Sequence, residues 1–500
     1  MTETSSAVAN GLRWGQQNWW RVLGVSALVV VPCLWHPHIE AGDLGSHVYN
    51  AWLAQLIGKG QAPGLYLASQ WNNILFDVSL LHVGNLFGFG AAEKIVVSAC
   101  VLILFWGVFA FVRAVTGRVP WLLTPCIGML AYGYSFNMGF MNYYTSLGLG
   151  CFCLALTWPE DTRVQGVDWI TAAVIAGLAW LAHPIGFLWA AATFAYVGIR
   201  RLLPGWWKSA LAVGAVALLV GIRWFLHRRI GLTVDWQSGL PFWQSNGADQ
   251  LMVYGDRYAR LAWILVGLGV ICFVAEAFSR RRDSGWWNKV ALPAELYLLA
   301  MVAVATLPEN LRVSLYAAWV GLLVSRLTTI SAILGLCVLG CVSLRKWGFA
   351  GFAGLAALYF LYLYQDTKTL NRLEANTERL VSSLPAGTRI IPTIGADPDW
   401  RVEFVGHVAD RACIGRCFVY SNYEPSSGQF RVRVAAGGSW IVSDSAENAE
   451  DMQGGGYEVQ QSDLPLKQLY QCGRGDWTKV CLRDLGAGES TGKFGFRPGR

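Results

Sequence analysis

The sequence predicts a polytopic α-helical membrane protein with a small α/β domain at its C-terminal end. Of its 500 residues, 54% are hydrophobic and only 14% are charged, whereas soluble proteins have about 25% charged residues. Apolar runs of roughly 17–25 residues, the length that crosses a bilayer, recur as far as Tyr364. From Asp366 onward the chain is polar and Gly-rich, without such runs. We therefore predict a transmembrane domain in 1–365 and an extracytoplasmic α/β domain in 366–500.

About eleven transmembrane helices account for the apolar runs. We place them at 22–36, 94–114, 119–135, 143–158, 168–182, 184–199, 209–226, 259–278, 290–307, 327–343 and 347–364. The loop after the first span is long, and its periodicity predicts two further helices, over 44–57 and 76–87. We expect these two to lie along the outer membrane surface, since both are short and carry polar residues.

The basic residues predict the orientation. Every second loop carries several of them: Arg113 and Arg118, then Arg200, Arg201 and Lys208, then Arg280, Arg281, Arg282 and Lys289, then Arg345 and Lys346. Because cytoplasmic loops are enriched in Lys and Arg, the N-terminus should be cytoplasmic and the C-terminal domain outside the cell (inner) membrane. The net charge of +7 therefore reflects topology and does not indicate nucleic acid binding.

Four of the twelve cysteines lie in the C-terminal domain: Cys413, Cys417, Cys472 and Cys481. An even number of cysteines in an oxidising compartment favours disulfides. Unpaired structural cysteines or a metal site are the alternatives, although the spacing is neither a C-x-x-C motif nor favourable for zinc. The sequence leaves the pairing open.

The stretch Glu40-Ala41-Gly42-Asp43-Leu44-Gly45-Ser46-His47, just after the first span, is the first candidate site. Acidic residues and histidines near the lipid cost free energy and therefore usually have a function. Asp77 lies in the second outer helix, Asn142 in a polar and aromatic outer turn, and His183 between two closely spaced spans. Isolated polar groups at membrane depth are expensive, so we expect them to converge on one outward-facing pocket with Asp43 and His47.

These motifs resemble the GT-C glycosyltransferases. The pattern Asp43-x-x-x-His47, followed by an Ala/Leu-rich helix, is similar to D-x-x-x-H variants of the first loop in that superfamily. The turn Gly139-Phe140-x-Asn142-Tyr143 and the pair His183-Pro184 resemble turns in bacterial members of uncharacterised specificity. The likeness covers about 1–365, with the long first loop, the membrane-lying helices and the spans, and the presence of an outer C-terminal domain fits the same architecture. The chain has one acid where better-studied members have an acidic pair.

The resemblance implies a membrane glycosyltransferase that moves a sugar from a polyprenyl-phosphate or polyprenyl-diphosphate donor to a glycan, lipid or protein acceptor at the outer face. The acceptor hydroxyl needs a general base, and Asp43 suits that role; the alternative is an N-cap for the helix over 44–57. His47, one turn further, would contact the donor phosphate or hydrogen-bond Asp43. The pattern requires no cofactor and leaves a divalent metal ion as an open alternative.

The leaving phosphate needs cations. Arg326 lies within the apolar stretch 315–343 and so needs an anionic partner or an aqueous pocket. Its guanidinium can bind phosphate in a bidentate fork, with Arg312 as a second cation, whereas an ion pair with Glu309 is the structural alternative. For His183, the structural alternative is a histidine that caps a helix end.

Two other classes fit the same composition. One is a lipid-linked glycan transporter or flippase, which should show internal repeats and broken helices; no convincing repeat is present. The other is a non-catalytic membrane subunit whose outer domain binds partners. No Gly-rich phosphate loop, Walker motif or haem-attachment motif supports a nucleotide-driven or cytochrome function.

Overall fold

The computed structural model describes residues 6–158, 165–229, 234–236, 245–312, 319–395, 400–473 and 476–492. The chain forms two compact units. The first comprises Met1–Val31, Ala99–Phe136 and Asn142–Leu361, and the second comprises Pro32–Ser98, Asn137–Met141 and Tyr362–Arg500. Residues 32–98 thus belong to the same unit as the C-terminal region, and the predicted division at 365/366 stays a prediction.

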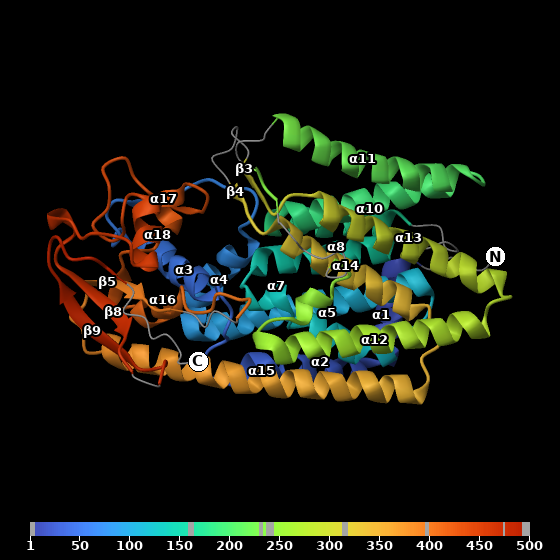
Figure 1. The fold of residues 1–500 in the computed structure, drawn as a ribbon, viewed down its shortest axis with the longest axis horizontal. Coiled ribbons are helices and arrows are strands. Elements are labelled where there is room, and N and C mark those ends of the chain that lie inside the picture. The colour runs from blue at the N-terminus through green and yellow to red at the C-terminus, as the bar shows by residue number, and fades with distance from the viewer. Residues whose placement is uncertain are drawn as a thin grey trace. The chain divides into compact units, whose positions relative to one another are not determined.

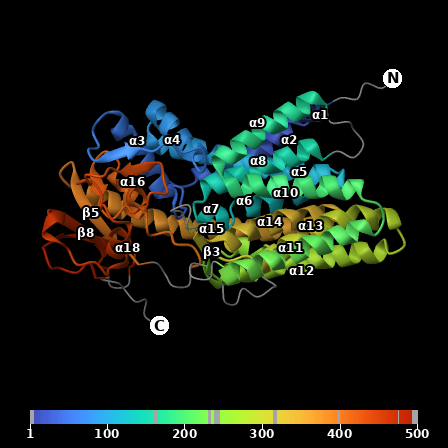
Figure 2. The same cartoon turned by 90° about the horizontal axis from the view of Figure 1, so that it is seen from above.

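The first unit is a bundle of helices, most of which run alongside one another (Figures 1 and 2). The helices that lie in it wholly or largely are α1 (Ala7–Gln17), α2 (Trp19–Leu34), α5 (Phe89–Thr116), α6 (Thr124–Ala131), α7 (Tyr134–Asn137), α8 (Met141–Thr157), α9 (Gly166–Ala182), α10 (Pro184–Leu202), α11 (Trp207–Arg229), α12 (Gly255–Ser279), α13 (Ser284–Thr306) and α14 (Leu323–Gly340). The helix α15 (Lys346–Val381) continues from this unit into the second. Two 3₁₀ turns, η1 (Trp121–Leu123) and η3 (Ala248–Leu251), and a small antiparallel sheet of β2 (Val234–Asp235), β3 (Asn310–Arg312) and β4 (Trp319–Val320) complete it.

Within the described ranges, six helices are long and apolar enough to cross a membrane: α5, α11, α12, α13, α14 and α15. The apolar helices α2 and α9 are shorter, with 16 and 17 residues. Each of the eleven predicted ranges contains a helix. Long apolar helices make the chain an integral membrane protein, while the number of helices that cross the bilayer stays a prediction.

The range 119–135 differs from the single helix that we predicted. It consists of η1, the eight-residue α6 and the start of α7. Pro120 and Pro125 flank the 3₁₀ turn, and proline lacks the N–H that a continuous helix needs. Gly133 interrupts the segment again, where a Cβ would lie 2.8 Å from the carbonyl oxygen of Gln250. The chain is therefore broken where two backbones approach closely.

The second unit contains the two helices that we predicted for the outer surface. They are α3 (Leu44–Gly58) and α4 (Leu75–Phe87), which match the predicted ranges to within one residue. The two helices pack against each other. Between them, β1 (Leu65–Leu67) pairs in antiparallel fashion with β7 (Val432–Val434) of the C-terminal region. The first outer loop and the C-terminal region therefore share a two-stranded sheet.

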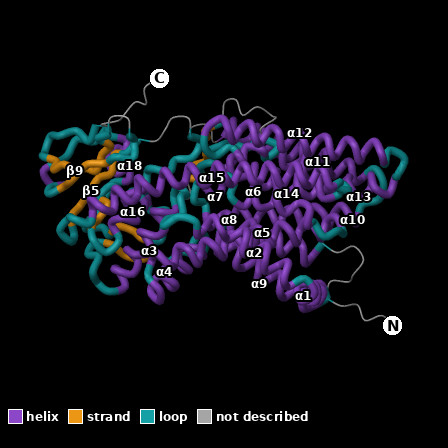
Figure 3. The backbone as a smooth tube through the Cα atoms, turned by 90° about the horizontal axis from the view of Figure 1, so that it is seen from below, coloured by secondary structure: helices purple, strands orange, loops and turns teal. Residues whose placement is uncertain are grey.

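The C-terminal region is an α/β fold, and its strands gather with short helices (Figure 3). The sheet has the order β6-β5-β8-β9, formed by β5 (Thr388–Thr393), β6 (Cys417–Val419), β8 (Leu466–Gln471) and β9 (Val480–Leu485). β5 is parallel to both β6 and β8, and β9 is antiparallel to β8. The remaining helices are α16 (Val408–Cys413), α17 (Glu424–Ser427), α18 (Ala446–Gly454) and the 3₁₀ turn η4 (Gln461–Asp463). A core around Ile391, Met452 and Leu466 holds the sheet together.

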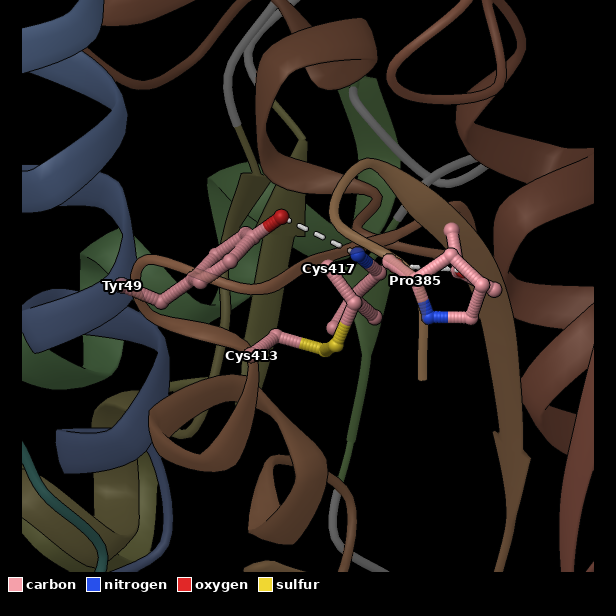
Figure 4. Close-up of a disulfide and its surroundings, with 6 residues drawn as sticks. Tyr49, Pro385, Cys413 and Cys417 are labelled. Atoms are coloured by element: carbon pink, nitrogen blue, oxygen red, sulfur yellow. Dashed lines mark hydrogen bonds between the residues drawn. A yellow bond between two sulfur atoms is a disulfide. The ribbon is translucent and has the colours of Figure 1, made fainter. Parts of the chain in front are cut away.

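Two disulfides lie in the C-terminal region. Cys413 is bonded to Cys417, and Cys472 is bonded to Cys481. Figure 4 shows the first bond with Tyr49 of α3 and Pro385 beside it. The hydroxyl oxygen of Tyr49 accepts a hydrogen bond from the backbone N–H of Val419 at 3.0 Å. The disulfide that joins the end of α16 to the start of β6 therefore lies next to helix α3.

Candidate functional site

The loop before α3 is held by the turn around Gly139. The N–H of Gly42 donates to the carbonyl oxygen of Asn137 at 2.7 Å, and the N–H of Asp43 donates to that of Met138 at 3.0 Å. Gly139 has a φ of +81°, and a Cβ there would lie 2.5 Å from the nitrogen of Asp43. Only glycine fits both the angle and the space. Two motifs that are about ninety residues apart in the sequence therefore meet, and the turn positions Asp43.

Asp43 stands at the N-terminus of α3, and its side chain makes no capping hydrogen bond. Its backbone is already helical, with φ −76° and ψ −4°, whereas a capping residue is normally extended. The side chain is partly exposed. The capping role considered from the sequence is therefore not the one that this geometry supports.

His47 is hydrogen-bonded to Asp77, with 2.6 Å between Nδ1 and Oδ1. The pair joins α3 to α4, and the edge of the imidazole packs on the Phe76 ring at 5.4 Å. Burial favours the neutral imidazole, but the Asp77 carboxylate, with smaller contributions from Glu424 and Asp43, outweighs burial and raises the pKa of His47 to about 9. His47 is therefore an imidazolium at neutral pH whose Nδ1 is occupied by Asp77.

One face of α3 is polar and buried. Asp43, Ser46, His47 and Asn50 follow the i, i+3, i+4, i+7 spacing of a single helical face. Glu424 of α17 lies against this face and accepts hydrogen bonds from the Ser46 hydroxyl and, at 2.8 Å, from Asn50 Nδ2. Burial raises the pKa of Glu424 to about 7, although His47, the Ser46 hydroxyl and His407 favour its charged form. Burial therefore outweighs the three groups that favour the charged form of Glu424.

A second histidine and carboxylate pair lies beside Asp43. His407 immediately precedes α16, and its Nδ1 lies 2.9 Å from Oδ2 of Asp410. Burial favours the neutral ring, but Asp410, followed by Asp43 and Glu424, raises the pKa of His407 to about 9. The ring of Tyr423 lies 6.1 Å from that of His407.

Sequence reasoning missed His407, Asp410 and Glu424. His407 follows β5 and Glu424 follows β6, two neighbouring parallel strands. In open α/β sheets, ligands bind outside the carboxyl ends of parallel strands. The strand over Arg389–Ile391 was predicted, so polar residues beyond its end were the available signal. The partner strand is only three residues long, which gave no recognisable pattern.

In the first unit, Arg326 lies in the first turn of α14, beside Tyr143. The Tyr143 hydroxyl donates to the carbonyl oxygen of Arg326 at 2.6 Å, and the guanidinium carbon lies 6.0 Å from the centre of the ring. His183 packs edge-on against the same ring at 5.6 Å. Tyr143, which follows the buried Asn142 on α8, therefore links Arg326 to His183.

The sequence left structural alternatives for His183, as a helix cap, and for Arg326, as the ion-pair partner of Glu309. His183 Nδ1 accepts a hydrogen bond from the N–H of Ile185 at 3.2 Å, so the ring caps α10. Glu309, the alternative partner for Arg326, accepts a hydrogen bond from the Ser325 hydroxyl at 2.9 Å. Arg312 ends β3 opposite Trp319.

The predicted site residues thus form two groups, one in each compact unit. Asp43, His47 and Asp77 lie together in the second unit, and Asn142, His183 and Arg326 lie in the first. The single pocket predicted for all of them stays a prediction. Within the residues that the structure describes, no three His, Cys, Asp or Glu side chains are arranged to hold a metal ion.

Comparisons with known proteins add little. No protein-family model matches the chain, and no curated protein matches it. A solved structure, ArnT from Cupriavidus metallidurans in the apo state, aligns with 94% of this chain and 98% of its own at 14% identity, with a TM-score of 0.40. That similarity is too low to define the fold or the function.

Proposed function

We propose that this chain is a membrane glycosyltransferase of the GT-C kind, which moves a sugar from a polyprenyl-phosphate or polyprenyl-diphosphate donor to an acceptor at the outer face of the membrane. The observation that carries the proposal is Asp43: a partly exposed carboxylate without a capping bond, in a loop held by a glycine turn, within electrostatic range of His47 and His407. The resemblance of the Asp43-x-x-x-His47 and Gly139-Phe140-x-Asn142-Tyr143 motifs to that superfamily supports it.

In this proposal Asp43 is the general base. The acceptor oxygen attacks the anomeric carbon, the bond from that carbon to the phosphate oxygen breaks, and Asp43 takes the acceptor's proton. The imidazolium of His47 presents Nε2 to the substrate because Asp77 occupies Nδ1. Asp77 therefore keeps His47 charged and oriented.

Arg326 is proposed to neutralise the leaving phosphate. A guanidinium holds two phosphate oxygens at once, and the Tyr143 contacts fix the turn of α14 that carries it. Arg312 is proposed as a second cation. Asn142 and His183 are proposed to line the substrate site.

Asp43→Asn tests the base. The change keeps the size of the side chain and removes its basicity, so the variant should insert into the membrane and bind donor lipid but lose transfer by about 10²- to 10⁴-fold. The assay measures transfer of radiolabelled glucose, mannose or galactose from polyprenyl monophosphate and from polyprenyl diphosphate to acceptors in membrane vesicles. His82→Gln is the control, because His82 is exposed on α4 and its Nδ1 lies 2.7 Å from the carbonyl oxygen of Val78 in the same helix.

Near-normal transfer by Asp43→Asn would leave the base unassigned. Binding of the donor without any transfer by the unmodified protein would favour a transporter or a non-catalytic subunit. Arg326→Lys keeps the charge but loses the fork, so it should weaken donor binding more than it slows the chemical step.

A further inference from the structure

The C-terminal α/β fold packs directly against the loop that carries Asp43. A Cβ at Gly45 would lie 2.6 Å from the carbonyl oxygen of His407 and 3.4 Å from the His407 Cβ. A Cβ at Gly42 would lie 3.0 Å from the carbonyl oxygen of Glu403. The two backbones therefore touch on both sides of Asp43, which requires glycine at each point.

Helix α16 is also fastened to this loop by a buried arginine. Arg411 donates to the carbonyl oxygen of Ile39 at 2.8 Å and to Glu93 at 3.0 Å, and it pairs with Glu374. Arg411 also pairs with Glu40, three residues before Asp43, at 3.4 Å. If α16 moved, the buried Arg411 would lose its carboxylate partners, and a buried charge without a partner is strongly unfavourable. These contacts therefore hold α16 in place. His407 at the start of α16 is thereby fixed relative to Asp43.

The His407 side chain is only 9% exposed, and Asp410 occupies its Nδ1. Nε2 is the nitrogen left for another partner. The groups that act on this ring are Asp410 on its own helix, Asp43 before α3 and Glu424 on α17. Burial raises the pKa of Tyr423, and the charges of Asp43 and of Glu450 on α18 raise it further.

The charges of the neighbouring side chains bear on the role of His407 next to Asp43. Asp43 and Glu424 act electrostatically on both imidazoles, His47 and His407, and each imidazole is also paired with a carboxylate of its own, Asp77 or Asp410. His47 belongs to the motif recognised in the sequence. His407 comes from a different part of the chain, and its backbone contacts the start of α3 at Gly45, two residues after Asp43.

We propose that His407, held by Asp410, is a positioning residue for Asp43, so that the C-terminal α/β fold completes the site of the first outer loop. The proposal rests on the proposed function for its catalytic meaning. The structural coupling between His407 and Asp43 is testable without any transfer activity.

Histidine side-chain NMR of the full-length protein in lipid nanodiscs tests the coupling. The chain has seven histidines, and the signal lost in His407→Gln assigns His407. Asp410→Asn should lower its pKa by about 1–3 pH units, since it removes a carboxylate in direct contact. Asp43→Asn should lower it as well, because Asp43 also favours the charged ring. A His407 titration that ignores Asp43→Asn would overturn the proposal.

The pH profile of transfer tests the positioning role. Transfer should fall as pH rises through about 9, where His47 and His407 lose their protons. Asp410→Asn should move this decline down by about 1–3 pH units with little change at lower pH, because His407 is still charged there. His407→Gln should slow transfer about 10- to 100-fold below pH 9, where His407 of the unmodified protein is charged, an order of magnitude below the loss of the base itself.

Glu447→Gln, an exposed carboxylate on α18, is the matched control and should leave the profile unchanged. An unshifted decline in Asp410→Asn would show that the pair is only structural. If the unmodified protein transfers none of the three sugars, the proposed function fails, and the NMR titration alone decides whether His407 is coupled to Asp43.

Discussion

His47 is a buried imidazole that is charged at neutral pH because Asp77 is 2.6 Å away. The raised pKa is also a statement about stability. Below the ordinary pKa of 6.5 the ring is protonated in both the folded and the unfolded chain, and the full stabilisation is present. As pH rises from 6.5 through about 9, the folded protein loses that advantage. The contribution is on the order of 3 kcal/mol, from a shift of about 2.5 pKa units at 1.36 kcal/mol per unit.

Asp77→Asn should therefore change the pH dependence of unfolding. We expect the variant to unfold at a lower temperature than the unmodified protein at pH 6.5, and the difference should shrink as pH approaches 9.5, because His47 is then neutral in both. Intrinsic tryptophan fluorescence in detergent measures the unfolding temperature. His82→Gln should follow the unmodified protein throughout. Parallel curves for Asp77→Asn and the unmodified protein would mean that the pair adds no pH-dependent stability.

At the scale of elements, glycines decide which segments can meet. Gly42, Gly45 and Gly139 each lie where a Cβ would come within 3.0 Å of another backbone. Through these contacts the turn 137–141, the loop before α3 and the segment 403–407 come together within the second unit. The surroundings of Asp43 are therefore built from three separate pieces of chain.

The sequence predicts the helices better than it predicts these contacts between distant segments. The ranges of α3 and α4 follow from local periodicity, which a single segment contains. The contact of Gly139 with Asp43 links residues far apart and leaves no local pattern. His407 and Glu424 depend in the same way on two short parallel strands whose pairing no segment reveals. Asp43, His47 and Asp77 could be singled out as candidates from the sequence because polar residues stand out beside apolar spans, and their function stays a prediction.

Gly139→Ala should damage the second unit more than a matched change in open space. Both Gly139 and Gly428 have positive φ, +81° and +70°, but nothing lies within 4 Å of a Cβ at Gly428. Alanine should cost about 1–2 kcal/mol of strain at either position. At Gly139, overpacking against Asp43 should add about 1–3 kcal/mol.

Thermal unfolding in detergent measures the stability difference, and the transfer assay should show a loss in Gly139→Ala only. Equal destabilisation by the two variants would mean that the loop before α3 yields to the added methyl group and that the close approach is not required.

For the whole molecule, the distribution of exposed apolar side chains separates the membrane part from the rest. Many large hydrophobic residues are exposed along the helices of the first unit, including Leu178, Leu188, Leu218 and Ile264. The most apolar window of α11 has no buried residue at all. Exposed apolar area of this extent is unfavourable in water and expected in lipid. The described C-terminal α/β fold exposes few such residues, with Trp440 as the large one.

Labelling of introduced cysteines tests the orientation that the basic loops predict. Glu447 is exposed in the C-terminal fold, and Ser284 is exposed at the start of α13, next to Arg280, Arg281 and Arg282. The free cysteines in the described ranges are buried or partly buried, so their background reaction should be low. In spheroplasts, a membrane-impermeant maleimide should react with Glu447→Cys, because positive loops stay in the cytoplasm and place the C-terminal fold outside. Ser284→Cys should react only after permeabilisation. The reverse labelling pattern would place the Asp43 loop in the cytoplasm, and the donor and acceptor would then have to be cytoplasmic too. Reaction of both cysteine variants in intact spheroplasts would show that the chain crosses the membrane differently between these two positions.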